Sequence, residues 1–346
     1  MRYTYPPTTL EITPLAISSE EHTMGKSLLP YLDMKVHPLL KTFSAPNITI
    51  IGDYNRDVGV VGVEKQGKLF NYERPTVTID DEGATVYCFP GWDYVFHFGN
   101  IYASYFAVQK QEKQIKCILP DENMCWSNLL QSSLADLPPV SIAILGYVEG
   151  LEFLSTSRVW HGRGHFKWKL CRFNTGEGVL LGCEHTYWGE IAGRVVEYLA
   201  GKGVETVIYS GKLGSLNPLH TPNRYVATGD VSILPDGTEI SWDNIFANPP
   251  QDEVKQGVHI TLPSVLEETI EWLNNQNEAH SFVDPEIGHM ALAAAKTNIR
   301  FSYLHIISDN LTTKYPQDLS NERHNAVTQS RKGLYQTIGT TLSHVL

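Results

Sequence analysis

Three short segments in the second half of the chain carry residues that could hold a small molecule. Ser210 to Leu216 (SGKLGSL) is typical of a glycine-rich exit from a buried strand, where backbone N–H groups can approach a ligand. Phe282 to His289 (FVDPEIGH) places Glu286 just before an Ala-rich helix. His305 to Asn310 (HIISDN) places Asp309 at the end of another strand. Two acids and a glycine turn at one sheet edge would form a ligand site, whereas each segment alone is also typical of a helix cap or turn.

Other catalytic patterns are weak or missing. The sequence contains no GxSxG nucleophile elbow and no GxxxxGK[ST] phosphate loop, which removes the main support for elbow-type hydrolases and P-loop nucleotidases. The run His161 to His165 (HGRGH) sets two histidines four residues apart, but its glycines disfavour the helix on which they could share a metal. We therefore expect a glycine loop there, and we predict no metal and no cofactor.

The elements that must position the three segments alternate between strand and helix from Val140 onward. Apolar runs predict strands at 141–146, 179–183, 206–211 and 301–308. Helical spacing of apolar residues predicts helices at 190–204, 264–275, 287–298 and 321–345. This alternation indicates an α/β fold, in which the carboxyl ends of the strands gather the three segments.

The first 139 residues have a different pattern. Between Asn47 and Cys117, short β-rich runs alternate with turn signals, which predicts a small, mainly antiparallel module. The expected strands include VGVVGVE (58–64), YVFHFG (94–99) and YASYFAV (102–108). A polar stretch, QSSLADLPP (131–139), predicts the connection. We therefore expect a β-rich accessory domain at 1–139 and an α/β domain at 140–346.

Composition narrows the class of partner. The chain has 346 residues, of which 42% are hydrophobic, and its formal net charge is −11. This acidic balance disfavours nucleic acid and anionic membranes, so a small molecule is the expected partner. The sequence begins without a secretory pattern and has no long apolar run, which predicts a cytoplasmic protein. The five cysteines form no CxxC pair, so we expect buried free thiols.

Taken together and in order, SGKLGSL, VDPE and ISD resemble the motifs of the nucleoside phosphorylase and nucleosidase superfamily. In that family a TGSAGGL-like turn ends one strand, a V-E-M-E-A motif carries the ribose-binding glutamate, and I-S-D ends another strand with the purine-facing acid. The resemblance extends over about residues 140–346 and includes purine nucleoside phosphorylase-like and methylthioadenosine nucleosidase-like proteins. It implies a three-layer α/β domain with a central mixed sheet, a nucleoside or nucleotide ligand, and a homo-oligomer.

The resemblance also implies roles for individual residues. Asp309 matches the catalytic acid that shares a proton with the purine leaving group, and Glu286 matches the acceptor of the ribose hydroxyls. Further substrate contacts are implied for the residues around these motifs and for one apolar pair that could pack on the base: Asp284, Pro285, Lys212, Leu213, Gly214, Val265 and Leu266.

Three positions depart from the family pattern. Phosphorylases of this family carry a phosphate-gripping arginine where this chain has Tyr209, which favours hydrolysis over phosphorolysis. Pro285 replaces a methionine that packs on the sugar, and Lys212 replaces a small residue. We therefore expect a hydrolytic N-glycosidase acting on a purine nucleoside or nucleotide-like substrate. The alternatives are a phosphate-dependent phosphorylase and a catalytically inactive nucleoside-binding or scaffold protein.

Overall fold

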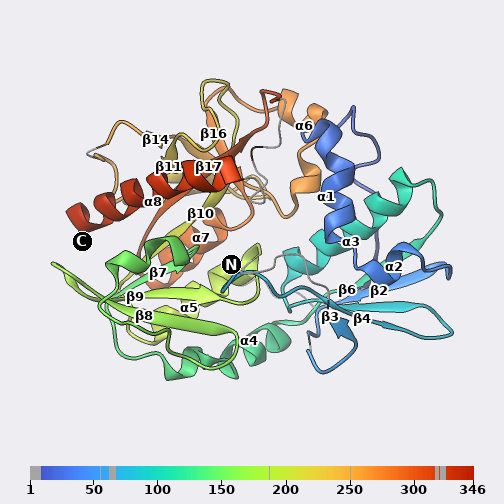
Figure 1. Cartoon of the computed structure of the whole chain (residues 1–346), viewed down its shortest axis with the longest axis horizontal. Coiled ribbons are helices and arrows are strands. Elements are labelled where there is room, and N and C mark those ends of the chain that lie inside the picture. Colours follow the sequence, from blue (N-terminus) through green and yellow to red (C-terminus); the bar gives the residue numbers. More distant parts are fainter. Residues whose placement is uncertain are drawn as a thin grey trace. The chain divides into compact units, whose positions relative to one another are not determined.

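The computed structural model of the chain describes residues 9–54, 56–61, 68–186, 188–249, 251–315, 319 and 325–346 (Figure 1). The chain forms two compact units. Unit 1 comprises Met1–Gln131, Glu184–Ile191 and Pro263–Asn275, and unit 2 comprises Ser132–Cys183, Ala192–Leu262 and Gln276–Leu346. The predicted boundary between 139 and 140 therefore falls inside unit 2. Residues 184–191 and 263–275, which the sequence placed in the second domain, belong to unit 1. Contacts between distant parts of the chain decide which unit a segment joins.

Unit 1 contains, within its described residues, a six-stranded mixed sheet. Its strands are β1 (Thr9–Glu11), β2 (Asn47–Ile51), β3 (Val60–Val61), β4 (Thr76–Ile79), β5 (Ala84–Tyr87) and β6 (Gln114–Ile118). The strand order is β1-β6-β2-β5-β4-β3. β2 pairs in parallel with both β5 and β6, and the outer pairs are antiparallel. Its helices are η1 (Gly25–Ser27), α1 (Leu28–Lys35), α2 (Pro38–Lys41), α3 (Trp92–Val108), α4 (Glu122–Leu130), η4 (Val265–Glu267) and α6 (Ile270–Asn274).

The prediction of strands at 94–99 and 102–108 was wrong, because this segment is α3. The runs at 94–99 and 102–108 form one buried helix instead of two strands. An aromatic-rich apolar run cannot by itself distinguish a buried strand from a buried helix. Because β5 and β6 point in the same direction, the chain between them needs a crossover, and α3 provides it. The expected strand at 58–64 is described only as far as β3, and the rest of it lies outside the described residues.

The predicted helix at 264–275 is also interrupted. η4 ends at Glu267 and α6 begins only at Ile270, because Thr269 acts as the cap of α6 and its hydroxyl accepts from the Trp272 N–H at 3.0 Å. Leu266 and Ile191 both lie in the hydrophobic core of unit 1, which explains why their two segments belong to that unit.

Unit 2 contains, within its described residues, an 11-stranded mixed sheet with helices packed on it. Its strands are β7 (Ile142–Gly146), β8 (Phe166–Phe173), β9 (Gly176–Cys183), β10 (Thr206–Ser215), β11 (Val226–Thr228), β12 (Val231–Ile233), β13 (Glu239–Ser241), β14 (Val254–Gln256), β15 (Val258–Thr261), β16 (His280–Asp284) and β17 (Arg300–Asn310). The order is β13-β12-β15-β16-β10-β17-β11-β14, with β7 between β10 and β9 and with β8 beside β9. The helices are η2 (Ser133–Asp136), η3 (Glu149–Leu154), α5 (Glu190–Gly201, which begins in a unit 1 segment), α7 (Ile287–Thr297) and α8 (Asn325–Val345).

This unit confirms the predicted α/β fold with a central mixed sheet. The strands predicted at 141–146, 179–183, 206–211 and 301–308 are β7, β9, β10 and β17, and the helices predicted at 190–204 and 287–298 are α5 and α7. The terminal helix is α8, and residues 321–324 of its predicted span lie outside the described residues. One detail differs, because β10 does not end at Gly211 but continues to Ser215 with a bulge between Leu213 and Gly214.

All five cysteines are buried and free, as predicted. In the part of the chain that the structure describes, no helix combines the length and apolar character needed to cross a bilayer.

Candidate functional site

Three strands of unit 2 bring the predicted segments to one edge of the sheet. β10 pairs in parallel with β17, which sets Gly214 opposite Asp309. β10 also pairs with β16 in the antiparallel sense, which sets Gly214 opposite Val283. A Cβ atom on Gly214 would lie 3.2 Å from both Asp309 Oδ2 and Val283 Cγ1, and 2.6 Å from Leu311 Cδ1. Gly214 is therefore the point where the three segments meet, and a larger residue there would have to displace the Leu311 side chain.

Asp309, the predicted catalytic acid, is partly exposed at the end of β17. Its Oδ1 atom lies 2.6 Å from Ser308 Oγ, and the same hydroxyl lies 3.3 Å from the carbonyl oxygen of Leu213. The Ser308 hydroxyl thus holds one carboxyl oxygen, and the other oxygen lies on the Gly214 side. The hydroxyl fixes the orientation that a catalytic acid would need, and the catalytic role of Asp309 stays a prediction.

Asp284, Pro285 and Glu286 form the buried turn between β16 and α7. Glu286 is the residue immediately before α7, and it is 6% exposed. Asp284 Oδ1 accepts hydrogen bonds from the backbone N–H groups of Glu286 and Ile287, both at 2.9 Å. Asp284 therefore caps α7 and holds the backbone of the turn that carries Glu286, while the substrate contact that the resemblance implies for Asp284 stays a prediction.

Two buried histidines flank Asp284. His259 Nε2, from β15, lies 3.0 Å from Asp284 Oδ1, and His305 Nε2, from β17, lies 3.5 Å from Asp284 Oδ2. Burial alone would raise the pKa of Asp284, but the charge and hydrogen bonding of His259 and His305 reverse that effect and hold the pKa well below its ordinary value. Burial lowers the pKa of His305. Asp284 is therefore a carboxylate at neutral pH.

α7 packs so closely on two strands that its second residue must be glycine. The N–H of Gly288 donates to Thr261 Oγ1 of β15 at 3.0 Å, and Ser232 Oγ of β12 lies 3.0 Å from the same oxygen. A Cβ atom on Gly288 would lie 2.4 Å from Thr261 Oγ1 and 2.7 Å from Ser232 Oγ. The helix therefore cannot keep its position if a side chain is added there.

We expect Gly288→Ala to lower the free energy of unfolding by about 1–3 kcal/mol, the usual cost of overpacking. The cause is the displacement of α7 from the two hydroxyls. Gly333→Ala is the matched control, because nothing lies within 4 Å of a Cβ atom on Gly333 in α8. Alanine there should be neutral or stabilising by up to about 1 kcal/mol. Thermal melting of both variants gives the comparison, and equal melting temperatures would contradict the close-packing argument.

The other predicted contact residues of unit 2 lie along β10. The Leu213 side chain is 2% exposed and belongs to the core, so only its backbone can face a ligand. Lys212 is partly exposed and pairs in register with Ile306. Tyr209, at the position of the family arginine, is 8% exposed and packs edge-to-face on His305 with ring centroids 4.5 Å apart. The aromatic ring therefore fills this position with an uncharged group.

Val265 and Leu266 lie in unit 1, on η4. Leu266 is fully buried in the core of that unit. The structure thus groups Asp309, Glu286 and Gly214 in one unit, and it places the apolar pair in the other. The predicted contact of the pair with the base remains a prediction.

Sequence analysis did not single out His259, Thr261 and Ser232 of the network around Asp284. His305 appeared only as the first residue of the HIISDN segment. The available signal was a histidine within an otherwise strand-like run, as in VHIT and YLHIIS. A polar residue buried in a strand needs a partner, and the sequence does not reveal which one.

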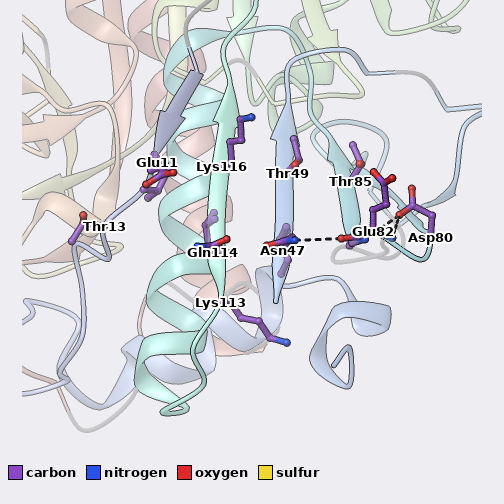
Figure 2. A pocket seen from close by; sticks show the side chains of 15 residues that line it. Glu11, Thr13, Asn47, Thr49, Asp80, Glu82, Thr85, Lys113, Gln114 and Lys116 are labelled. Carbon is purple, nitrogen blue, oxygen red and sulfur yellow. Dashed lines mark hydrogen bonds between the residues drawn. The ribbon is translucent and has the colours of Figure 1, made fainter. Parts of the chain in front are cut away.

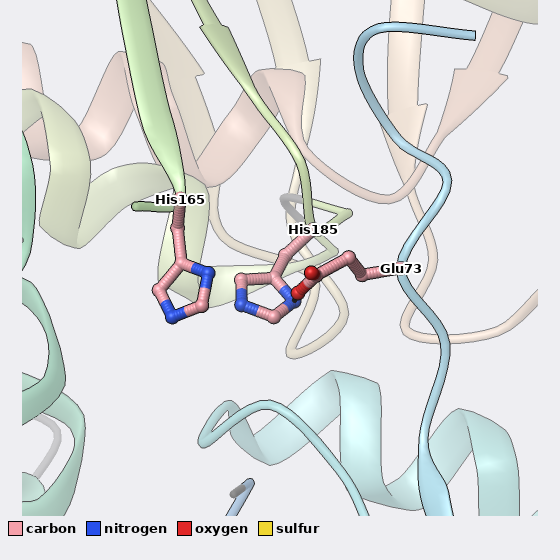
Figure 3. A group of neighbouring side chains, drawn as sticks. All are labelled: Glu73, His165 and His185. Carbon is pink, nitrogen blue, oxygen red and sulfur yellow. Dashed lines mark ion pairs between the residues drawn. The ribbon is translucent and has the colours of Figure 1, made fainter. Parts of the chain in front are cut away.

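Another buried carboxylate, Glu73, lies in unit 1. It forms an ion pair with Arg56, accepts from the Tyr54 hydroxyl at 3.1 Å, and lies 3.3 Å from His185 Nδ1 (Figure 3). The Glu73 N–H donates to the carbonyl oxygen of Glu184 at 2.9 Å. Arg56 pairs with the carboxylate and compensates its burial. These contacts tie the segment before β4 to the segment 184–191, which is a structural role.

A polar depression with a volume of about 540 Å³ lies on the sheet of unit 1 (Figure 2). Its lining mixes acids such as Glu11 and Asp80 with Lys113 and Lys116. Lys113 Nζ is 2.8–3.1 Å from three backbone carbonyl oxygens of residues 43–45. The lining carries both charges, and Lys113 is bound to the protein itself, so the depression does not indicate which kind of ligand would bind. We therefore assign no site there.

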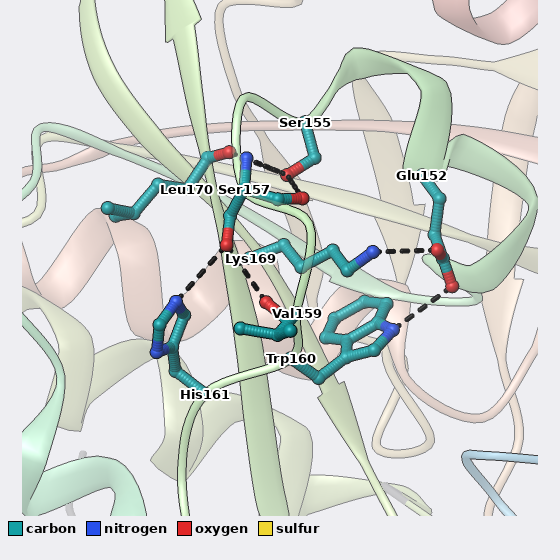
Figure 4. A network of polar contacts seen from close by, with 8 residues as sticks. All are labelled: Glu152, Ser155, Ser157, Val159, Trp160, His161, Lys169 and Leu170. Atoms are coloured by element: carbon teal, nitrogen blue, oxygen red, sulfur yellow. Dashed lines mark hydrogen bonds and ion pairs between the residues drawn. The ribbon is translucent and has the colours of Figure 1, made fainter.

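The HGRGH run is a loop, as predicted. Gly162 and Gly164 have φ values of 95° and 83°, which are left-handed conformations that favour glycine. His161 Nε2 lies 3.1 Å from Ser157 Oγ, so this histidine is engaged within its own loop (Figure 4). Nearby, Lys169 Nζ pairs with Glu152 Oε2 at 2.8 Å, which links η3 to β8.

Comparison with known proteins gives one sequence relative and many similar structures. No protein-family model matches the chain. The chain is 28% identical over 259 residues to the protein named oxidoreductase cns1 of Cordyceps militaris, a match that covers 65% of this chain and 32% of that protein. The chain thus spans about a third of the length of this curated relative.

Solved structures similar to the chain include nucleosidases. The 5'-methylthioadenosine/S-adenosyl homocysteine nucleosidase of Campylobacter jejuni is 14% identical with a TM-score of 0.47, and the match covers 59% of this chain and 99% of that chain. The Helicobacter pylori nucleosidase is 16% identical with a TM-score of 0.45, and the match covers 60% of this chain and 98% of that chain. The P. knowlesi homologue of P. falciparum PNP is 13% identical with a TM-score of 0.43, and the match covers 59% of this chain and 91% of that chain.

Proposed function

We propose that unit 2 cleaves the N-glycosidic bond of a purine nucleoside or nucleotide-like substrate, with water as the nucleophile. One observation carries this proposal. The register of β10, β16 and β17 sets the Asp309 carboxyl beside Gly214, next to the strand that leads into Glu286. The reaction needs one acid for the departing purine and another for the sugar. Asp309, beside Gly214, and Glu286 stand on separate elements and could take these two tasks.

The chemistry assigns a different task to each acid. Cleavage of the bond between sugar and base places negative charge on the departing purine and positive charge on the sugar. Asp309 in its protonated form gives its proton to the purine ring and so neutralises the leaving group. Glu286 accepts hydrogen bonds from the ribose hydroxyls and fixes the sugar. Water then forms the new bond to the anomeric carbon, and its proton passes to solvent or to the Asp309 carboxylate, which has given its own proton to the purine.

Water is favoured over phosphate because of Tyr209. A phosphate nucleophile needs a cation to hold it, and arginine is suited to that task through its two parallel N–H groups. Tyr209 is buried against His305 and offers an aromatic ring at this position. Phosphorolysis would therefore need a cation from elsewhere in the chain.

A second candidate is a nucleoside-binding protein without turnover. Pro285 and Lys212 both depart from the family pattern in the turn and strand that would surround the sugar. If these residues exclude the reactive geometry, purine bases should raise the melting temperature of the protein although no nucleoside is cleaved.

The test is incubation of the full chain with a panel of purine nucleosides and nucleotides, with and without phosphate, followed by chromatography of the free base. We expect base release from at least one substrate without phosphate. Release only with phosphate would replace hydrolysis by phosphorolysis. Stabilisation by adenine without release from any substrate would establish the binding function. If the protein shows no base release and no stabilisation, both the enzymatic and the binding function are excluded.

A further inference from the structure

A continuous set of buried polar contacts connects β12, β15 and β16 to the first turn of α7. The Gly288 N–H donates to Thr261 Oγ1, which lies 3.0 Å from Ser232 Oγ. Ser232 Oγ lies 2.9 Å from His259 Nδ1, and His259 Nε2 lies 3.0 Å from Asp284 Oδ1. Asp284 Oδ1 in turn accepts from two backbone N–H groups of the same helical turn. The contacts thus start and end on the turn that contains Glu286.

His259 contacts both sides of this network. Its Nε2 atom faces the Asp284 carboxylate at 3.0 Å, and its Nδ1 atom lies 2.9 Å from Ser232 Oγ. Thr261 Oγ1 accepts from the Gly288 N–H and shares a hydrogen bond with the Ser232 hydroxyl. His259 therefore couples the two ends of the network.

The order of contacts from Ser232 through His259 to Asp284 is that of a serine–histidine–acid triad, but burial excludes that use. Ser232 and His259 are 0% exposed and Asp284 is 4% exposed. A nucleophilic serine must reach a substrate, and this one is enclosed by the sheet and α7. The role left to the network is therefore to hold the neighbouring residues in position.

We propose that His259 is a positioning residue for Glu286, acting through Asp284, so that the imidazole fixes the turn on which the ribose-binding carboxylate stands. This inference rests on the proposed function for its catalytic consequence. Its structural part concerns only the first turn of α7. Besides Asp284, the ring of Tyr303 packs edge-to-face on His259 with ring centroids 6.2 Å apart.

A matched pair of amide variants tests the proposal. In His259→Gln, the side-chain amide nitrogen reaches the position of Nε2 and can still donate to Asp284. In His259→Asn, the shorter amide reaches only the position of Nδ1 and leaves Asp284 without this partner. We expect kcat/KM for base release to fall about tenfold or more in His259→Asn, and to stay within about threefold of the unsubstituted protein in His259→Gln.

Amide hydrogen exchange provides a readout that needs no turnover. The N–H groups of Glu286, Ile287 and Gly288 should exchange faster in His259→Asn than in His259→Gln, whose rates should match those of the unsubstituted protein. Equal exchange rates in the two variants would overturn the positioning role. So would losses of kcat/KM that are equal in the two variants and parallel to the fall in melting temperature. If the unsubstituted protein releases no base, the proposed function fails, and exchange alone then decides the inference.

Discussion

Asp309→Asn should reduce base release by about 100- to 10,000-fold, the usual contribution of a general acid, while nucleoside binding is retained. Asparagine has the same shape, and its Oδ1 atom can still accept from Ser308 Oγ, which lies 2.6 Å from that position. It cannot supply an acidic proton to the departing purine. Steady-state rates of base release and the binding affinity of an uncleaved analogue, measured on the same preparation, separate the two effects.

Asp243→Asn is the control for this experiment. Asp243 is an exposed acid of unit 2 that lies outside the three predicted segments, so the same chemical change there should leave the rate of base release unaltered. An Asp309→Asn variant with the turnover of the unsubstituted protein would show that Asp309 is not the catalytic acid. Loss of both turnover and binding would instead indicate a role in holding the site together.

Asp284→Ala should have the largest effect on stability, lowering the free energy of unfolding by about 3–5 kcal/mol. The substitution removes the acceptor of two N–H groups at the start of α7 and leaves two buried histidines without their carboxylate. For a unit of this size, such a loss corresponds to a fall in melting temperature of roughly 6–20 °C. Differential scanning calorimetry measures it, with Asp243→Ala as the exposed control.

The contribution of Asp284 to the stability of the protein should decrease at low pH. Its pKa in the folded protein lies below the ordinary aspartate value of 3.8, so its ionised form contributes stability that is fully present above about pH 4. That contribution is lost as the pH falls further and the carboxylate becomes protonated. The difference in melting temperature between the unsubstituted protein and Asp284→Ala should therefore shrink below about pH 4. A difference that grew on acidification would contradict the low pKa.

Four strands of unit 2 (β7, β9, β10 and β17) and the helices α5, α7 and α8 could be predicted because their signals are local. In α5, Val195 and Leu199 are spaced four residues apart and both are fully buried. The same kind of reasoning failed at α3, where aromatic residues fit a strand or a buried helix equally well. The parallel direction of β5 and β6 decided between the two, and that direction is a property of the sheet.

The sequence by itself determined the α/β character of the second half of the chain, the burial of the cysteines and the order of the three segments around Gly214, Glu286 and Asp309. Tertiary structure alone decided that Asp284 faces His259 and His305, and that residues 184–191 and 263–275 join unit 1. The physical reason is the range of the interactions. Propensity and periodicity act over a few residues, whereas a buried carboxylate takes whichever partners the fold places beside it, however distant they are in the chain.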